Sequence, residues 1–309
     1  MTKKILVATD KPFASEAINL MKAVIANKPD FKIELLEKYT EVAQFKAAVK
    51  DADALIIRSD IASKEIIDAA GQLKIIVRAG AGYDNIDLAA ATASKVVAMN
   101  TPGQNANAVA ELVFGMMVYI ARCKFNGKSG SELMGKKLGL HAYGNVGRNV
   151  ARIAKGFGME VYAFDPFVPA DKIEAEGVKA VKSIEELYST CHYVSLHIPA
   201  NDQTKKSINF DLINRMPKGA VLINTARKEV VCEESLKKIF AARKDFRYVT
   251  DVAPDSLADL EKEYAERIYC TPKKLGAQTE EANVNAGVAA VKQIVAFFEK
   301  GDVSFQVNK

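Results

Sequence analysis

The chain has 309 residues, which exceeds the size at which a single hydrophobic core usually keeps growing, so two domains are expected. With 49% apolar residues, 26% charged residues and a formal net charge of +5, the composition is that of an ordinary globular protein rather than a disordered chain. No apolar run approaches the ~18 residues of a membrane span, no basic run indicates nucleic acid, and no signal peptide is recognisable, so we expect a cytoplasmic protein.

The first part of the chain alternates short apolar runs with amphipathic stretches. The runs predict strands at 5–8, 33–36, 54–57 and 75–77, and the stretches between them predict helices at 15–27, 40–50 and 63–70. A longer apolar helix is expected at 105–122. Strands that alternate with helices indicate a parallel sheet.

A second alternation follows that helix. It predicts strands at 137–142, 161–164, 193–197, 220–224 and 248–250, with a helix at 148–156 after the first of them. A last helix is expected at 280–300; it has no strands of its own, so we expect it to pack on the first domain. The fold class is therefore α/β, with two doubly wound parallel sheets.

A glycine turn connects the strand at 137–142 to the helix that follows. Gly144 lacks a Cβ atom, so the backbone can approach the pyrophosphate of a dinucleotide, and Gly147 allows the helix to pack closely on the strand. The first turn of the helix, with Asn145 and Val146, presents free N–H groups to phosphates. Asp165 ends the next strand, where it accepts hydrogen bonds from ribose hydroxyls and repels a 2′-phosphate, so NAD is favoured over NADP.

Ala142 occupies the position of the first glycine in this pattern. Alanine is unfavourable at positive φ, so we expect a turn with ordinary backbone angles there. The alternative is a plain strand–helix turn in an unrelated α/β domain, but the order of strand, turn, helix, strand and acid favours a cofactor site.

Several segments around this turn match a known pattern in the same order. They are Arg58-Ser59, 78–87 (Arg-Ala-Gly-Ala-Gly-Tyr-Asp-Asn-Ile-Asp), Asn100-Thr-Pro102, Ala110-Glu-Leu112, Leu196-His-Ile-Pro199, Ile223-Asn-Thr-Ala-Arg227, Asp251-Val252, Thr271-Pro272 and Leu275-Gly-Ala277. On these segments the chain resembles the D-isomer-specific 2-hydroxyacid dehydrogenases, and within them most closely the short phosphoglycerate dehydrogenases. The resemblance implies a Rossmann NAD-binding domain, residues 102–282, inserted into a flavodoxin-like substrate-binding domain formed by residues 1–101 and 283–309.

The resemblance also implies the site residues. Arg227 follows the strand at 220–224 and is similar to the family's catalytic arginine, whose planar fork grips the substrate carboxylate and C2 oxygen. The glycine-rich loop at 79–82 is expected to offer N–H groups to the same carboxylate, and Arg58 and Arg78 to bind a phosphate, with structural salt bridges as the alternative for these two arginines. The expected substrate-binding residues are Arg58, Arg78, Gly80, Ala81, Gly82 and Asn100. The expected NAD-binding residues are Gly144, Asn145, Val146, Gly147, Asp165, Ile198, Pro199, Thr225, Ala226, Asp251, Gly276 and Ala277.

The general acid/base departs from the family. Its motif has a histidine between proline and Leu-Gly, whereas residues 271–277 read Thr-Pro-Lys-Lys-Leu-Gly-Ala, with one extra residue and no histidine. None of the three histidines, His141, His192 and His197, matches that position, although His197 is expected to line the cofactor pocket. We therefore expect a lysine to replace it: Lys274, which directly precedes Leu-Gly-Ala, with Lys273 as the fallback.

The glutamate that the family pairs with its histidine is also absent. Ser256 stands at that position, and whether Asp255, one step earlier, assists is left open. Lysine has an unperturbed pKa of ~10.4 against ~6.5 for histidine, so it needs no carboxylate to remain protonated. To act as a base, the lysine needs a lowered pKa instead, which the nearby positive charges of Arg227 and the oxidised nicotinamide are expected to supply.

The expected function is NAD-dependent oxidation of D-3-phosphoglycerate, a small anionic substrate, in serine biosynthesis. A hydroxypyruvate or glyoxylate reductase, or another D-2-hydroxyacid dehydrogenase, is the first alternative; an NAD-sensing binding protein without catalysis is the second. The four scattered cysteines predict reduced thiols, and no metal site is expected. We expect a homodimer formed through the helix at 105–122, although the link at 124–135 is short for the family.

Overall fold

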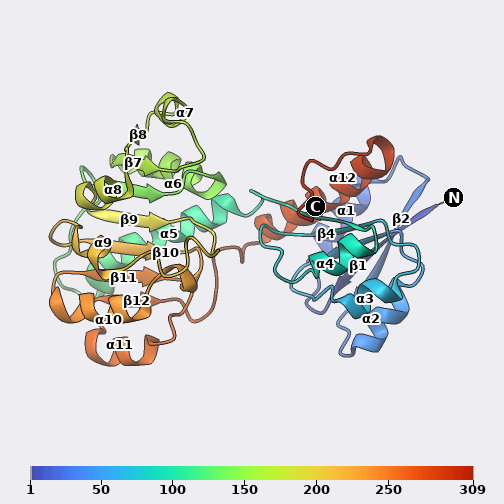
Figure 1. The fold of residues 1–309 in the computed structure, drawn as a ribbon, viewed down its shortest axis with the longest axis horizontal. Coiled ribbons are helices and arrows are strands. Elements are labelled where there is room, and N and C mark those ends of the chain that lie inside the picture. The colour runs from blue at the N-terminus through green and yellow to red at the C-terminus, as the bar shows by residue number, and fades with distance from the viewer. Residues whose placement is uncertain (1, 309) are drawn as a thin grey trace. The chain divides into compact units, whose positions relative to one another are not determined.

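The computed structural model describes residues 2–308, which fold into two compact units. Unit 1 comprises the chain up to Asn105 together with the segment from Gln278 onward, and unit 2 comprises Ala106–Ala277 (Figure 1). Within the described residues, no helix combines the length and apolar character needed to cross a membrane.

Unit 1 is built on a sheet of five parallel strands in the order β2-β1-β3-β4-β5. The strands are β1 (Lys3–Thr9), β2 (Phe31–Glu37), β3 (Ala54–Ile57), β4 (Ile75–Arg78) and β5 (Val97–Asn100). Helices α1 (Ser15–Val24) and α12 (Glu280–Lys300) bury one apolar cluster with the sheet, and α2 (Val42–Val49), α3 (Lys64–Ala69) and α4 (Leu88–Ala93) bury another. The predicted strands and helices of this part are confirmed, while β5 and α4 were not predicted.

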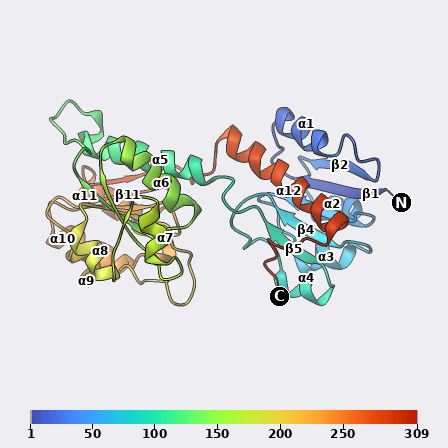
Figure 2. The same cartoon turned by 90° about the horizontal axis from the view of Figure 1, so that it is seen from above.

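Helix α12 packs on unit 1, as predicted (Figure 2). Its apolar residues Ala290, Val291 and Ile294 are fully buried in the cluster that also contains residues of α1 and β1. Thr279 caps its start by accepting a hydrogen bond from the Ala282 N–H at 3.1 Å, and Gly301 ends it in the left-handed conformation. The helix therefore completes one face of a sheet formed by strands that all lie within residues 3–100.

Unit 2 contains a sheet of seven parallel strands in the order β12-β11-β10-β9-β6-β7-β8. The strands are β6 (Lys137–His141), β7 (Glu160–Phe164), β8 (Lys179–Ala180), β9 (Tyr193–Leu196), β10 (Val221–Asn224), β11 (Arg247–Thr250) and β12 (Ile268–Cys270). Helices α5 (Ala106–Ala121), α6 (Asn145–Gly156) and α7 (Ala170–Ala175) contribute to the core on one face, and α8 (Ile184–Thr190), α9 (Phe210–Asn214), α10 (Glu233–Ala242) and α11 (Leu257–Tyr264) to the core on the other. Two parallel sheets with helices on both faces confirm the predicted fold class.

Two details of unit 2 differ from the prediction. Helix α6 begins at Asn145, three residues before the predicted start at Arg148, so the glycine turn itself contains the first helical turn. Strands β8 and β12, at the two edges of the sheet, were not predicted; they have only two and three residues and little periodic signal.

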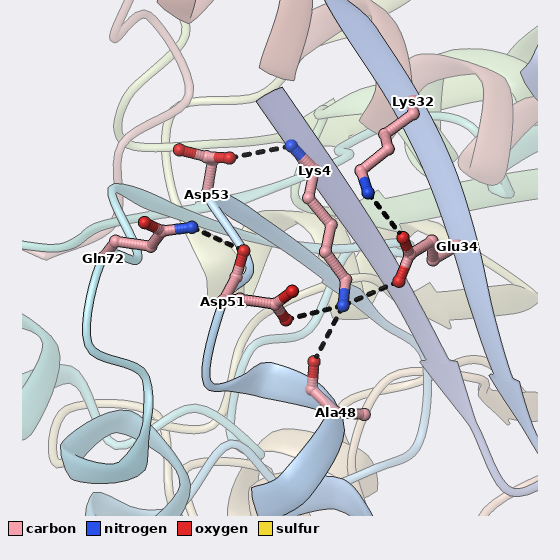
Figure 3. Close-up of polar contacts among 7 residues, drawn as sticks. All are labelled: Lys4, Lys32, Glu34, Ala48, Asp51, Asp53 and Gln72. Carbon is pink, nitrogen blue, oxygen red and sulfur yellow. Dashed lines mark hydrogen bonds and ion pairs between the residues drawn. The ribbon is translucent and has the colours of Figure 1, made fainter. Parts of the chain in front are cut away.

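A buried lysine joins three elements at the amino end of the unit 1 sheet (Figure 3). The Lys4 ammonium lies 2.6 Å from the Glu34 carboxylate and 2.6 Å from the Asp51 carboxylate. Burial lowers the pKa of Lys4, but the hydrogen bonds to Asp51 and Glu34 outweigh that effect and the pKa is raised. The contacts connect β1, β2, the end of α2 and the loop that precedes β3, because the Lys4 ammonium also donates to the Ala48 carbonyl oxygen at 3.4 Å.

Candidate functional site

The glycine turn follows β6 at the point where the order of the unit 2 sheet reverses, since β7 lies on one side of β6 and β9 on the other. Ligands of open α/β sheets bind at such a point, outside the carboxyl ends of the strands. Ala142 has φ +85°, so the expectation of ordinary backbone angles at this residue is wrong. The turn requires a left-handed residue whatever its side chain, and alanine adopts that conformation at a cost of about 1 kcal/mol relative to glycine.

The two glycines of the turn have different surroundings. A Cβ atom on Gly144 would meet nothing within 4 Å, so the space beside the turn is open to a ligand. A Cβ atom on Gly147 would lie 2.6 Å from the carbonyl oxygen of Ala142, so α6 packs against the turn only because this residue is glycine. Gly144 is the N-cap of α6 and no side chain caps the helix, which leaves the N–H groups of its first turn, at Asn145 and Val146, available to an anion.

Asp165 lies just after β7 and faces the same turn. Its Oδ2 atom accepts a hydrogen bond from the Tyr143 N–H at 2.7 Å, and its Oδ1 atom accepts one from the Phe167 N–H at 2.8 Å. Each carboxylate oxygen can accept a further hydrogen bond, so the fixed carboxylate suits a diol such as ribose.

Buried polar atoms without a partner gather after the neighbouring strands. Within residues 2–308 these include His197 Nε2 after β9, Thr225 Oγ1 after β10 and Asp251 Oδ1 after β11. Such atoms are unfavourable unless a ligand or water pairs with them. Together with the open space at Gly144, they fit a ligand that has phosphates at one end and hydrogen-bonding groups at the other, as NAD has. Ile198, Pro199, Ala226 and Ala277 lie in the same loops.

Two histidines lie close to this region in the neutral form. Burial lowers the pKa of His197 to about 3 and that of His141 to about 4. Neither imidazole gains a proton near neutral pH, so neither is suited to exchange one with a substrate there.

Arg227 is held by its own backbone loop. The side chain of Asn224 accepts a hydrogen bond from the Ala226 N–H at 2.9 Å and donates one to the Arg227 carbonyl oxygen at 2.9 Å. The Arg227 Nη1 atom donates to the Ala226 carbonyl oxygen at 2.9 Å. Asn224 was not predicted as a site residue, although an asparagine at the end of an apolar strand was a usable signal.

Asp251 connects Arg227 with the lysine segment. It is 2% exposed, and its Oδ2 atom accepts a hydrogen bond from the Gly276 N–H at 2.8 Å. Burial raises the pKa of Asp251, while the nearby charges of Lys274 and Arg227 act to lower it. Arg227, Lys274 and Asp251 therefore form one electrostatic group, with Lys274 exposed beside the buried carboxylate.

The two residues that stand near the family's glutamate position are engaged elsewhere. The Asp255 carboxylate forms an ion pair with Lys228 at 2.6 Å. The Ser256 hydroxyl donates to the Glu233 carboxylate at 2.5 Å. Of the carboxylates in this region, Asp251 is the one that the Lys274 charge acts on, whereas Asp255 is paired with Lys228.

In unit 1, the glycine loop after β4 lies against the side chain of Arg78. The Arg78 Nε atom donates to the Arg58 carbonyl oxygen at 3.0 Å. Gly80 has φ +150°, which L side chains rarely adopt, and a Cβ atom there would displace the Arg78 guanidinium, so glycine is favoured. The Asn100 side chain donates to the Ala81 carbonyl oxygen at 2.6 Å; it is buried and holds the loop in place.

Arg58 is partly committed to structural contacts. Its Nη2 atom donates to the Asn283 side chain of α12 at 2.6 Å, and its guanidinium lies over the Phe13 ring, 4.8 Å from the ring centroid. Burial lowers its pKa, and the acids Asp60 and Asp10 counteract this. Buried Asp60, which was not predicted, accepts hydrogen bonds from the Asp10 N–H and the Tyr39 hydroxyl and so fixes the start of this loop.

The predicted residues thus gather at two places, one in each unit. Arg58, Arg78, the loop containing Gly80, Ala81 and Gly82, and Asn100 lie together at the carboxyl ends of β3, β4 and β5. In unit 2, the glycine turn, Asp165, Thr225, Arg227, Asp251 and the segment from Lys274 to Ala277 lie at the carboxyl ends of their sheet.

Comparisons with known proteins agree with this arrangement. Residues 119–272 match the family model of the D-isomer specific 2-hydroxyacid dehydrogenase, NAD binding domain. A hydroxypyruvate reductase of Thermotoga maritima is 33% identical over 311 residues, covering 93% of this chain and 96% of that protein. A D-3-phosphoglycerate dehydrogenase of Methanocaldococcus jannaschii is 35% identical over 85% of this chain, which spans about half (51%) of that relative.

A solved structure is similar over the whole chain. It is an NAD⁺-bound 3-phosphoglycerate dehydrogenase of Entamoeba histolytica, with a TM-score of 0.89 and 45% identity, and the match covers 100% of this chain and 99% of that one.

Proposed function

The chain belongs to the D-isomer-specific 2-hydroxyacid dehydrogenases, which are NAD-dependent oxidoreductases, and from this we propose that it oxidises D-3-phosphoglycerate to 3-phosphohydroxypyruvate in serine biosynthesis. The observation that carries the choice of substrate is the pair Arg58 and Arg78 beside the Gly80 loop. A loop N–H suffices for a carboxylate, whereas two guanidinium groups match the higher charge of a phosphate. The similarity to a phosphoglycerate dehydrogenase over the whole chain supports the same choice.

In this proposal unit 2 binds NAD, which supplies the hydride acceptor. Gly144, Asn145, Val146 and Gly147 hold the pyrophosphate, and Asp165 binds the adenosine ribose. Thr225, Asp251 and the loops with Ile198, Pro199, Ala226, Gly276 and Ala277 bind the remainder of the cofactor. The buried orphan oxygens of Thr225 and Asp251 support this assignment, because each gains a hydrogen-bond partner.

Arg227 and Lys274 carry the substrate chemistry. Arg227 holds the substrate carboxylate and the C2 oxygen, so the developing carbonyl forms beside a fixed positive charge. The neutral amine of Lys274 takes the proton of the C2 hydroxyl as the C2 hydride leaves and the carbonyl forms. Lys274 and Arg227 both place positive charge near the buried Asp251 carboxylate, and this shared location supports a lysine in this role.

A panel of substrates tests the proposal. We expect kcat/KM for D-3-phosphoglycerate to exceed that for D-glycerate and D-lactate by about 100-fold, because binding energy from the remote phosphate stabilises the transition state. An Arg78→Gln variant should lose most of this difference while D-glycerate oxidation stays nearly constant, which makes the unphosphorylated acid the internal control. Equal rates for the three acids would reject phosphoglycerate as the substrate.

A hydroxypyruvate reductase is the second candidate, because the relative from Thermotoga maritima carries that name and matches over nearly the full length of both chains. The same panel, run with NADH, distinguishes the two. Reduction of hydroxypyruvate faster than 3-phosphohydroxypyruvate, with no effect of Arg78→Gln, supports the reductase.

We further propose that the protein is a homodimer formed through α5 and that it acts in the cytoplasm on a small anionic substrate. Helix α5 is apolar on average, and its exposed neighbours Phe125 (66% exposed) and Met134 (71%) follow it in the short link. Size-exclusion chromatography with light scattering tests the dimer, and a fluorescent fusion tests the location.

A further inference from the structure

Unit 2 has a cavity at the edge of its sheet opposite the strand ends already described. The cavity has a volume of about 320 Å³. It is bordered by the amino ends of four adjacent strands, β6, β9, β10 and β11, and by the loop that follows α5. This volume is within the range of small-molecule sites. Because ligands of open α/β sheets normally bind at the carboxyl ends, the cavity is separate from the nucleotide turn.

Three cations line the cavity, each at the start of a different strand. They are Lys136 before β6, Lys218 before β10 and Arg247 at the start of β11. Within residues 2–308 none of the three is engaged in an ion pair. Unpaired cations that converge on one cavity create a positive potential that attracts an anion.

The positive charges at the cavity affect the pKa values of two neighbouring groups. Burial lowers the pKa of His192, which also lines the cavity, and the charges of Lys136 and Lys137 lower it further. The pKa of Tyr193 is raised by burial, and the charge of Arg247 acts in the opposite direction. Asp245 contacts the lining residue Gly219, whose N–H it binds at 2.7 Å, and its carboxylate forms an ion pair with Arg243 at 2.6 Å.

Hydroxyl groups complete the lining. Ser129, Ser131 and Tyr193 also border the cavity. Hydroxyl donors combined with lysine and arginine are the usual partners of phosphate oxygens, whereas a carboxylate needs fewer donors.

The loop that closes the cavity has a strained backbone. Cys123, Lys124 and Phe125 all have φ between +51° and +58°, which non-glycine residues rarely adopt in succession. The Lys124 ammonium holds the turn by donating to the carbonyl oxygens of Ala265 and Ile268, both at 2.6 Å. Strain maintained by such contacts is frequent at ligand clamps.

We propose that this cavity is a second anion site, which binds inorganic phosphate or a small phosphate ester through Lys136, Lys218 and Arg247. The site lies on unit 2 alone, and it stands whether or not D-3-phosphoglycerate is the substrate.

Cys123 provides a local readout, because it borders the cavity and is partly buried, while Cys232, which is also partly buried, does not border it. The NAD-saturated protein is alkylated with iodoacetamide at constant ionic strength, with potassium phosphate or potassium chloride, and the rate at each cysteine is measured by peptide mass spectrometry. With phosphate at about five times its Kd, alkylation of Cys123 should slow about sixfold, since only the free fraction reacts, while Cys232 is unaffected.

The double variant Lys136→Gln/Arg247→Gln should lose the protection. The matched control Lys238→Gln/Lys262→Gln, which removes the same charge from α10 and α11, should retain it. Glycerol 3-phosphate in place of phosphate distinguishes the ligands: stronger protection by the ester assigns the site to phosphorylated metabolites, and protection by phosphate alone assigns it to the free ion.

Three results would overturn the proposal. The first is equal alkylation of Cys123 in phosphate and chloride, and the second is equal protection of Cys123 and Cys232. The third is a Cys123 thiol that resists alkylation without any anion, because the cavity is then closed to solvent.

Discussion

At the scale of single residues, the lysine at position 274 changes the pH at which the proposed chemistry works. A histidine base is neutral above ~6.5, whereas a lysine of ordinary pKa is largely protonated below ~10.4. Burial raises the pKa of Asp251, and the charges of Lys274 and Arg227 act to lower it, so the lysine lies beside a buried carboxylate and a second cation. Replacement of either lysine of the segment therefore gives distinct, measurable results.

A Lys274→Met variant should lose about 10²–10⁴-fold in kcat, which is the usual contribution of a general base. NADH binding, measured by fluorescence, should be retained, because the cofactor groups are unchanged. Lys273→Met is the matched control and should keep nearly full activity, as its side chain is similarly exposed but is one residue further from Gly276. In Lys274→His, the rise of the rate with pH should move toward acid. Full turnover in Lys274→Met would contradict the assignment.

Ala142 carries left-handed backbone strain at φ +85°, and a single substitution relieves it. Ala142→Gly should raise the stability of unit 2 by about 1 kcal/mol, or roughly 2–4 °C in Tm. The control is Ala151→Gly, in the middle of α6, which should destabilise by about 1 kcal/mol because ordinary helical geometry favours alanine. Thermal unfolding followed by circular dichroism measures both, and a destabilised Ala142→Gly variant would refute strain at the turn.

Single-residue predictions succeeded where a motif has a physical reason and failed where a partner comes from a distant segment. Gly147 was predicted to allow close packing, and the Ala142 carbonyl oxygen occupies the space that a side chain would need. Asp60 and Asn283 were not predicted, because their roles depend on Tyr39, Asp10 and Arg58 being brought near by the sheet. Sequence spacing contains no information of that kind.

At the scale of elements, strongly periodic segments were predictable and short ones were not. The β-branched run at β3 and the apolar face of α12 identify their structures without tertiary information. Strand β8 has two residues and α4 is an alanine-rich helix of six, so neither presents a pattern that is longer than chance. Such elements form because the sheet edge and the core provide partners.

The Lys4 cluster at the strand ends of unit 1 gives a pH-dependent contribution to stability. Hydrogen bonds from Lys32 and Lys4 lower the pKa of Glu34, and one from Lys4 lowers that of Asp51. The contribution is thus present above the unfolded pKa values near ~4 and is lost as pH falls through the lower folded values. The raised pKa of Lys4 gives the opposite limit: stability is lost as pH rises through that value, above 10.5.

The double variant Glu34→Gln/Asp51→Asn should therefore be less stable at pH 7, by about 1 kcal/mol, because the buried Lys4 ammonium loses both anions, although the exposure of the two carboxylates weakens each pair. Below pH 4, its free energy of unfolding should also depend less on pH than that of the parent. Asp68→Asn, which breaks the exposed pair with Lys64, is the control and should change stability by less than about 0.5 kcal/mol. Urea unfolding of unit 1 between pH 2 and 7 makes the comparison; equal curves for parent and double variant would contradict it.

At the scale of the whole molecule, alternation along the chain predicted two parallel sheets but not the order of their strands. That order depends on which strands pair, and pairings such as β6 with β9 join residues more than 50 positions apart. The same holds for α12, whose packing on unit 1 was predicted only because no strands remained for it to join. Each unit has apolar cores of its own, two clusters on the faces of each sheet.

Separate cores should make the two units unfold as separate transitions, and NAD should affect them unequally. With NAD at about 100 times its Kd, binding stabilises unit 2 by about 2.7 kcal/mol, which corresponds to roughly 5–10 °C in Tm for a unit of this size. In differential scanning calorimetry one transition should therefore move to higher temperature and the other should stay where it is.

Asp165→Ala should reduce the shift with NAD far more than with NADP, because the carboxylate contacts the ribose hydroxyls and repels a 2′-phosphate. Equal shifts of both transitions would show that the cofactor is not bound by unit 2 alone, and an unchanged shift in Asp165→Ala would reject the role of that carboxylate.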